Sequence, residues 1–131
     1  MTDPVREFIR AFNEQDLEAF VAVLDPEVEL HAGRGLRKGR EAARVWATRK
    51  PGGVQQTIEL EELYEEGLEG GGGRAVALVR RVWRWAEDGS PAGLDEMAWA
   101  FELRDRRVSS WRPHEDREQA LRVHGFAPPS A

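Results

Sequence analysis

The sequence predicts an α+β fold in which helices come first and a sheet follows. Two adjoining segments, 3–14 and 16–24, carry apolar side chains at the i, i+3, i+4, i+7 spacing of amphipathic helices. From residue 54 onward, most of the chain instead alternates between apolar and polar side chains, as strands do. A short strand and a third helix are predicted between these two halves.

The first two helices have clear start signals. Asp3 precedes Pro4 and is the predicted N-cap of the first helix, while Asp16 is the predicted N-cap of the second. The two helices present matching apolar stripes: Val5, Phe8, Ile9 and Phe12 in the first, and Leu17, Phe20, Val21 and Leu24 in the second. We therefore expect both helices to pack against one core.

The segment after the second helix changes its periodicity. Pro26 ends the helical pattern, and residues 28–31 then alternate like a short strand. A third helix is expected to begin near Arg40 and to end before Pro51 and the two glycines that follow it.

Four further strands are predicted in the second half of the chain: 54–66, 75–87, 94–104 and 108–114. The glycine-rich segment 67–74 joins the first two of these strands. Because it leads into a strand and contains no lysine, it is interpreted as a hairpin connection and not as a phosphate-binding loop. A last helix is predicted from the N-cap Asp116 to Gly125.

Length and composition indicate a single domain, here placed at residues 1–126, with 127–131 as a disordered tail. The absence of cysteine excludes disulfides and thiolate chemistry. The net charge of −5 argues against a nucleic-acid partner. No apolar run suits an export signal or a membrane span, so a soluble cytoplasmic protein without membrane partners is expected.

Four stretches, in this order, carry a resemblance to a known superfamily: FIRAFNEQDLEAF, DPEVELHAG, GREAARVW and AWAFELRDRRVSSWRPHEDREQAL. In them the chain resembles the nuclear transport factor 2-like superfamily, and within it the SnoaL-like and steroid-isomerase-like small domains. The resemblance implies a cone-shaped fold of the cystatin-like α+β barrel type. Its curved, mixed or antiparallel sheet would pack on the N-terminal helices and leave a pocket at the open end. Such a fold does not by itself settle the function.

The resemblance also implies a catalytic candidate, His31. In steroid-isomerase-like relatives, the strand after the second helix carries the aspartate that moves the substrate proton, and His31 holds the corresponding position. An imidazole can exchange a proton near neutral pH; the alternative is that His31 only forms hydrogen bonds in the pocket wall. The isomerase's own oxyanion donors are replaced by Phe8 and by Ala98 or Trp99, so steroid isomerase activity is not expected.

Aromatic residues are the candidate pocket lining. The alternation of the strand 94–104 puts its aromatic set on one side, which we interpret as the helix-facing side. Family topology would aim Trp46, Trp99 and Trp111 at the interior, although large aromatics also fill ordinary cores. The full predicted lining is Phe8, Phe12, Trp46, Met97, Trp99, Phe101 and Trp111.

Two further tryptophans suggest self-association. Trp83 and Trp85 share one side of their strand, where they would form an exposed apolar patch on the sheet. A second copy of the chain could cover this patch, so we predict a homodimer formed through the sheet face.

Two functions from different classes remain open. The first is a cofactor-independent isomerase, cyclase or hydrolase that acts on a hydrophobic small molecule with His31 as proton shuttle. The second is a non-catalytic ligand-binding or accessory dimerisation domain. No cofactor or metal is expected, because His31, His114 and His124 lack ligand spacing. A second ionisable or donor group near His31 would favour the enzyme.

Overall fold

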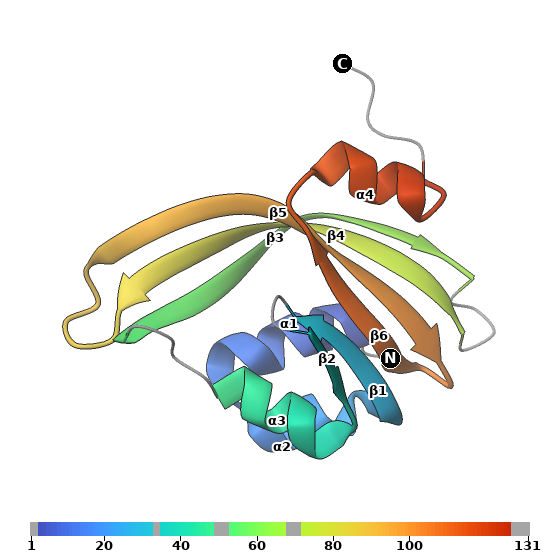
Figure 1. Ribbon diagram of the computed structural model, residues 1–131, viewed down its shortest axis with the longest axis horizontal. Helices are drawn as coiled ribbons and strands as arrows, with labels where there is room; N and C mark the ends of the chain where they lie inside the picture. Colours follow the sequence, from blue (N-terminus) through green and yellow to red (C-terminus); the bar gives the residue numbers. More distant parts are fainter. Residues whose placement is uncertain (1–2, 33–34, 49–52, 68–71, 127–131) are drawn as a thin grey trace.

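The computed structural model describes residues 3–32, 35–48, 53–67 and 72–126, so the predicted tail lies outside the described residues. Figure 1 shows the arrangement of the helices and strands. In chain order they are α1 (Pro4–Glu14), α2 (Leu17–Ala22), β1 (Leu24–Ala32), β2 (Gly35–Lys38), α3 (Arg40–Thr48), β3 (Val54–Glu66), β4 (Gly73–Trp85), β5 (Pro91–Arg104), β6 (Arg107–His114) and α4 (Arg117–Val123).

The six strands form one curved sheet in the order β2-β1-β6-β5-β4-β3. The pairing of β1 with β6 is parallel, and the other four pairings are antiparallel. Figure 1 shows α1, α2 and α3 on the concave side of the sheet and α4 on its convex side. The predicted α+β class, with a curved mixed sheet on the N-terminal helices, is confirmed, and the sheet does not close into a barrel.

The helices begin at the predicted N-caps. A carboxylate oxygen of Asp3 accepts a hydrogen bond from the backbone N–H of Val5 at 2.8 Å. Asp16 and Asp116 cap α2 and α4 in the same way, through the N–H groups three residues further on. Each cap satisfies a backbone donor that the first helical turn leaves without a partner.

The strand β3 contains an irregularity that explains its imperfect alternation. The register with β4 shifts between Leu60 and Glu62, which is the signature of a β-bulge. Before the shift, Ile58 and Leu60 face the helices; after it, Leu63 takes the core-facing position and Tyr64 packs on the convex side. Strict alternation along 54–66 predicts that Tyr64 shares a side with Ile58, and the bulge makes that prediction wrong.

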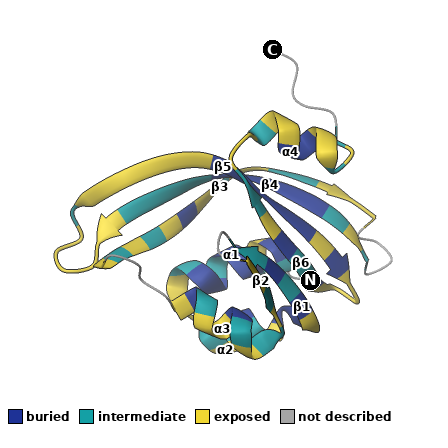
Figure 2. Cartoon of the chain, in the orientation of Figure 1, coloured by how far each residue is buried: buried dark blue, intermediate teal, exposed yellow. Residues whose placement is uncertain are grey.

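The sheet buries apolar side chains on both faces (Figure 2). The larger core lies between the concave face and helices α1–α3, and a smaller one lies under α4. Arg117 fixes the start of α4 by donating to the backbone carbonyls of Val79 at 2.8 Å and Met97 at 3.3 Å. The same guanidinium forms ion pairs with Glu61 and Glu96.

The region around β1 differs from the prediction. The strand β1 already begins at Leu24, so Pro26 lies inside it, whereas the sequence pattern placed this strand after Pro26. The short strand β2 was not predicted; it pairs antiparallel with the end of β1, where His31 lies opposite Leu36. At four residues, β2 is too short for alternation to reveal it.

A pair of carboxyl groups links the start of α1 to the end of β3. A side-chain hydrogen bond with Asp3, together with burial and the charge of Asp3, raises the pKa of Glu65 from 4.5 to about 7, against the opposing charge of Arg6. Between these two pH values the folded state keeps a proton that the unfolded chain releases. This group's contribution to stability is therefore fully present below about pH 4.5 and is lost as the pH rises through 7.

We expect Glu65→Gln to stabilise the protein at pH 8 and to change its stability little at pH 4.5, because the amide can donate to Asp3 at every pH. Solvent screening at this exposed position limits the gain to about 1 kcal/mol. Urea unfolding at both pH values measures it. Glu66→Gln is the control, since it removes a carboxylate from the same strand that pairs with Arg74 instead. An equal effect of Glu65→Gln at both pH values would contradict the prediction.

Candidate functional site

Aromatic side chains from both the helices and the sheet form a cluster on the concave face. Trp99 on β5 and Trp111 on β6 lie with ring centroids 5.2 Å apart, nearly perpendicular. From the helices, Trp46 lies 4.7 Å from Trp111, and Phe12 lies 5.3 Å from Trp46 and 5.9 Å from Trp99. The edge-to-face pairs among them, Trp99 with Trp111 and Phe12 with Trp99, are stabilised beyond their buried area.

Both sheet tryptophans are almost completely buried, Trp99 at 2% and Trp111 at 4% exposure. The indole N–H of each is shielded from solvent and has no acceptor among the described residues. Buried donors nearly always have a partner in folded proteins, so an unpaired one requires an explanation. The concave face thus carries two such donors on adjacent strands.

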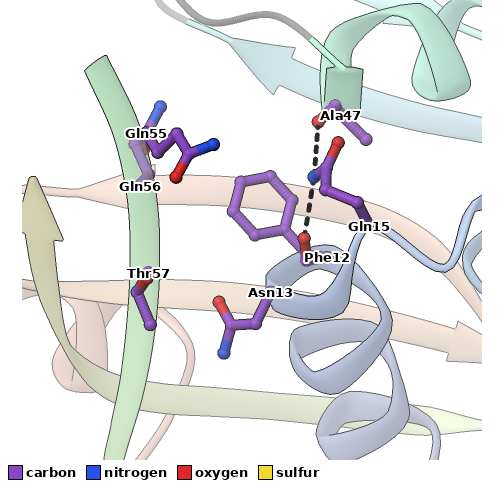
Figure 3. A pocket seen from close by; sticks show the side chains of 7 residues that line it. All are labelled: Phe12, Asn13, Gln15, Ala47, Gln55, Gln56 and Thr57. Carbon is purple, nitrogen blue, oxygen red and sulfur yellow. Dashed lines mark hydrogen bonds between the residues drawn. The ribbon is translucent and has the colours of Figure 1, made fainter. Parts of the chain in front are cut away.

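A small hollow opens beside this cluster, between α1, α3 and β3. Its volume is about 90 Å³, and Figure 3 shows Phe12 facing β3 across it. The lining consists of Phe12, Asn13, Gln15, Ala47, Gln55, Gln56 and Thr57. Sites for drug-sized ligands usually measure about 300–1,000 Å³. This hollow is therefore small, with a polar rim and one aromatic ring.

Two amides of the rim are already used to join the elements around it. Asn13 at the end of α1 makes two hydrogen bonds with the backbone of Ile58 on β3, each 2.8 Å long. Gln15 donates to the carbonyls of Phe12 at 2.9 Å and Ala47 at 3.1 Å, which ties α1 to α3 (Figure 3). These bonds hold the three walls of the hollow at fixed positions.

The structure places the predicted pocket residues together on the concave face, but it does not make them all walls of a hollow. Of the seven, Phe12 lines the hollow described above. Trp46 is half-buried and packs between Phe12 and Trp111. The remaining members are buried in the core: Phe8, Met97, Trp99, Phe101 and Trp111.

His31 does not lie with the aromatic cluster. Because strand residues alternate, Val28 and Leu30 take the core-facing positions of β1, and His31 projects from the opposite face. There its Nδ1 lies 3.3 Å from a guanidinium nitrogen of Arg112, and its Nε2 lies 3.7 Å from a carboxylate oxygen of Glu29. The structure thus separates the catalytic candidate from the predicted pocket lining, and its catalytic role stays a prediction.

The other two histidines meet on the convex side. The Nε2 atoms of His114 on β6 and His124 after α4 lie 3.1 Å apart. Burial lowers the pKa of both imidazoles, and the charge of Arg112 lowers both further. The residues that the structure describes contain no group of three or more potential metal ligands. The pair therefore acts in the structure as a contact between α4 and the sheet.

Sequence reasoning missed the polar rim of the hollow. One signal was available: Gln56 lies two positions before Ile58 on β3, so strand alternation alone puts it on the core-facing side. Asn13 could not be found in this way, because its partner Ile58 lies 45 residues away and the contact exists only in the folded chain.

Comparisons with known proteins give one family and many similar folds. A family model described as SnoaL-like domain matches residues 5–111. None of the curated proteins matches this sequence.

Three solved structures illustrate the fold similarity. A nuclear transport factor 2-like protein of unknown function from Burkholderia pseudomallei is 20% identical, with 95% of this chain and 99% of that chain covered and a TM-score of 0.68. An LEH-like epoxide hydrolase from Mycobacterium tuberculosis is 16% identical, with coverages of 92% and 81% and a TM-score of 0.69. A second M. tuberculosis protein, in complex with estradiol-17beta-hemisuccinate, is 14% identical, with coverages of 86% and 91% and a TM-score of 0.70. At these identities the likeness shows the fold alone.

Proposed function

Since this chain belongs to the SnoaL-like domain family, we propose that it binds a small apolar organic molecule on the concave face of its sheet, against the aromatic cluster. The observation that carries the proposal is the pair of buried indole N–H groups without acceptors among the described residues. Unsatisfied donors in the core lower the stability of the fold, since each costs about 1–3 kcal/mol. They are therefore not expected in a core that serves stability alone. A ligand with an acceptor atom would remove that cost.

The hollow beside Phe12 is the proposed route to this site. Phe12 is in contact distance of both Trp46 and Trp99, so a ligand that displaces its ring meets the indoles. Trp46 is half-buried on α3 and can give way more easily than the buried rings of the sheet. The similar fold of the M. tuberculosis protein in complex with estradiol-17beta-hemisuccinate supports a small organic ligand for this chain.

A thermal-shift titration with apolar compounds of one or two rings tests the proposal. Binding to the native state alone raises stability by about 2.7 kcal/mol at a ligand concentration of 100 Kd. Gln56→Phe, which narrows the rim of the hollow, is expected to abolish the shift. Glu59→Phe is the matched control, because it adds the same ring to an exposed position of the same strand. Equal shifts in both variants would refute the proposed route, and no shift with any compound would refute the function.

Acid/base catalysis by His31 is the second candidate function, and the flanking carboxylate of Glu29 and guanidinium of Arg112 favour it. Both ring nitrogens of His31, however, already lie close to these two side chains. No aromatic residue of the cluster lies beside the imidazole. We therefore expect His31→Ala to leave ligand binding unchanged. Turnover of a bound compound that disappears in His31→Ala, with binding retained, would establish the enzyme and displace the binding proposal.

Self-association through the sheet face is also part of the proposal. Trp85 at the end of β4 is 47% exposed. The end of β4 and the start of β5 project beyond the helices (Figure 2). Trp83 is held there by an N–H bond of 2.9 Å to Asp95. Light scattering is expected to give twice the monomer mass, and Trp85→Arg to give the monomer. A monomeric wild type at micromolar concentration would contradict the homodimer.

No helix within the described ranges has the length and apolar character that a membrane crossing requires.

A further inference from the structure

The two buried indole N–H groups define what kind of molecule the concave face accepts. We propose that the ligand is uncharged and carries a carbonyl oxygen, which accepts hydrogen bonds from the indole N–H groups of Trp99 and Trp111. This inference rests on the proposed ligand-binding function and names the class of ligand. Neither donor has an acceptor among the described residues.

The lining of the cluster excludes a charged ligand. Among the described residues, those that are buried are apolar with the exception of Asp25 near the start of β1. His31, the ionisable residue that the sequence suggested for this site, projects from the opposite face of the sheet. Burying a carboxylate or an ammonium among these rings without a partner charge would cost far more than burying a ketone.

The backbone holds the two donors firmly. Trp99 and Trp111 lie on the paired strands β5 and β6, where Trp99 is opposite Pro113 and Phe101 is opposite Trp111. Both rings are packed against other rings on the helix side, including Trp46 against Trp111 and Phe8 against Trp99. Donors on neighbouring strands of one sheet are preorganised, so little conformational entropy is lost in aligning them when a ligand binds.

The chemistry of the donors also predicts selectivity. An indole nitrogen only donates, so a ligand needs an acceptor and gains nothing from a hydroxyl hydrogen or an amine hydrogen. A site with buried polar groups rejects an analogue that leaves them unpaired. We therefore expect ketones to bind better than hydrocarbons of the same shape.

A pair of matched probes tests this inference. Acetophenone and ethylbenzene have nearly the same shape, but only acetophenone has a carbonyl acceptor. Their dissociation constants are measured by calorimetry with the wild-type chain and with Trp99→Phe and Trp111→Phe, which keep an aromatic ring and remove the N–H. Wild type is expected to prefer acetophenone about tenfold, which corresponds to about 1.4 kcal/mol. Either variant should lose most of that preference, which is read as the ratio of the two dissociation constants.

The possible outcomes distinguish the proposed class of ligand from the ligand-binding function on which it rests. If wild type binds both probes equally, and neither variant alters their ratio, the indole donors do not select the ligand, although the binding function stands. If neither probe binds, nor any other apolar compound, the proposed function fails first. Phe101→Leu, which changes a neighbouring buried ring without a donor, is the control: it should preserve the ratio of the two affinities.

Discussion

Replacing Phe8 by alanine is expected to lower the free energy of unfolding by about 3–5 kcal/mol, as for other buried phenylalanines. Phe8 is completely buried on α1 and connects the helices to the sheet. Its ring centroid lies 4.9 Å from that of Phe20, 5.1 Å from Phe101 and 6.0 Å from Trp99. Removing the ring leaves a cavity among three aromatic residues that are too rigid to collapse into it.

Urea unfolding followed by tryptophan fluorescence measures this loss. Native domains have only about 5–15 kcal/mol of stability, so a loss of this size can leave Phe8→Ala too unstable for a complete unfolding curve. Phe8→Leu then gives a smaller loss of about 1–2 kcal/mol that can be measured. Leu36→Ala, at a position that is 54% exposed, is the control for shortening an apolar side chain. A loss no larger than that of Leu36→Ala would show that the cluster closes around the gap.

Local sequence signals predicted most of the fold. The caps at Asp3, Asp16 and Asp116 were predictable because capping uses a side chain and backbone groups only three residues apart. The helix-facing side of β5 was predictable because its aromatic residues alternate without interruption. On β3 the same reasoning failed after Leu60, since a bulge reverses the two faces and nothing in the pattern marks its position.

The candidate site was less predictable, and His31 shows why. The catalytic role of His31 was predicted from its position along the chain in a related family. The face of the sheet on which it lies depends instead on the alternation of side chains along β1. Val28 and Leu30 are apolar residues of that strand and face the core. The alternation of side chains therefore puts His31 on the opposite face of the sheet. The unpaired donors of Trp99 and Trp111 were hidden for another reason, because hydrogen-bond satisfaction depends on the whole folded chain.

A substitution of Gly73 by alanine is expected to be far more damaging than the same change at Gly72, the preceding glycine in the connection between β3 and β4. Gly73 has φ = 118°, a conformation that residues with a Cβ rarely adopt. A Cβ there would collide with the backbone carbonyl oxygen of Glu66 and lie 2.7 Å from the carbonyl carbon of Gly67. Backbone atoms cannot turn away as a side chain can, so the paired strand ends must separate.

The expected cost is about 2–4 kcal/mol, from backbone strain together with overpacking. Gly72→Ala is a closely matched control: its Cβ would meet the Leu103 carbonyl oxygen at an ordinary 3.5 Å, and no positive φ is required. Hydrogen exchange should show faster opening at the ends of β3 and β4 in Gly73→Ala, because these strand ends pair Glu66 with Arg74. Equal unfolding free energies for the two variants would mean that the hairpin can adopt a conformation without the close approach at Gly73.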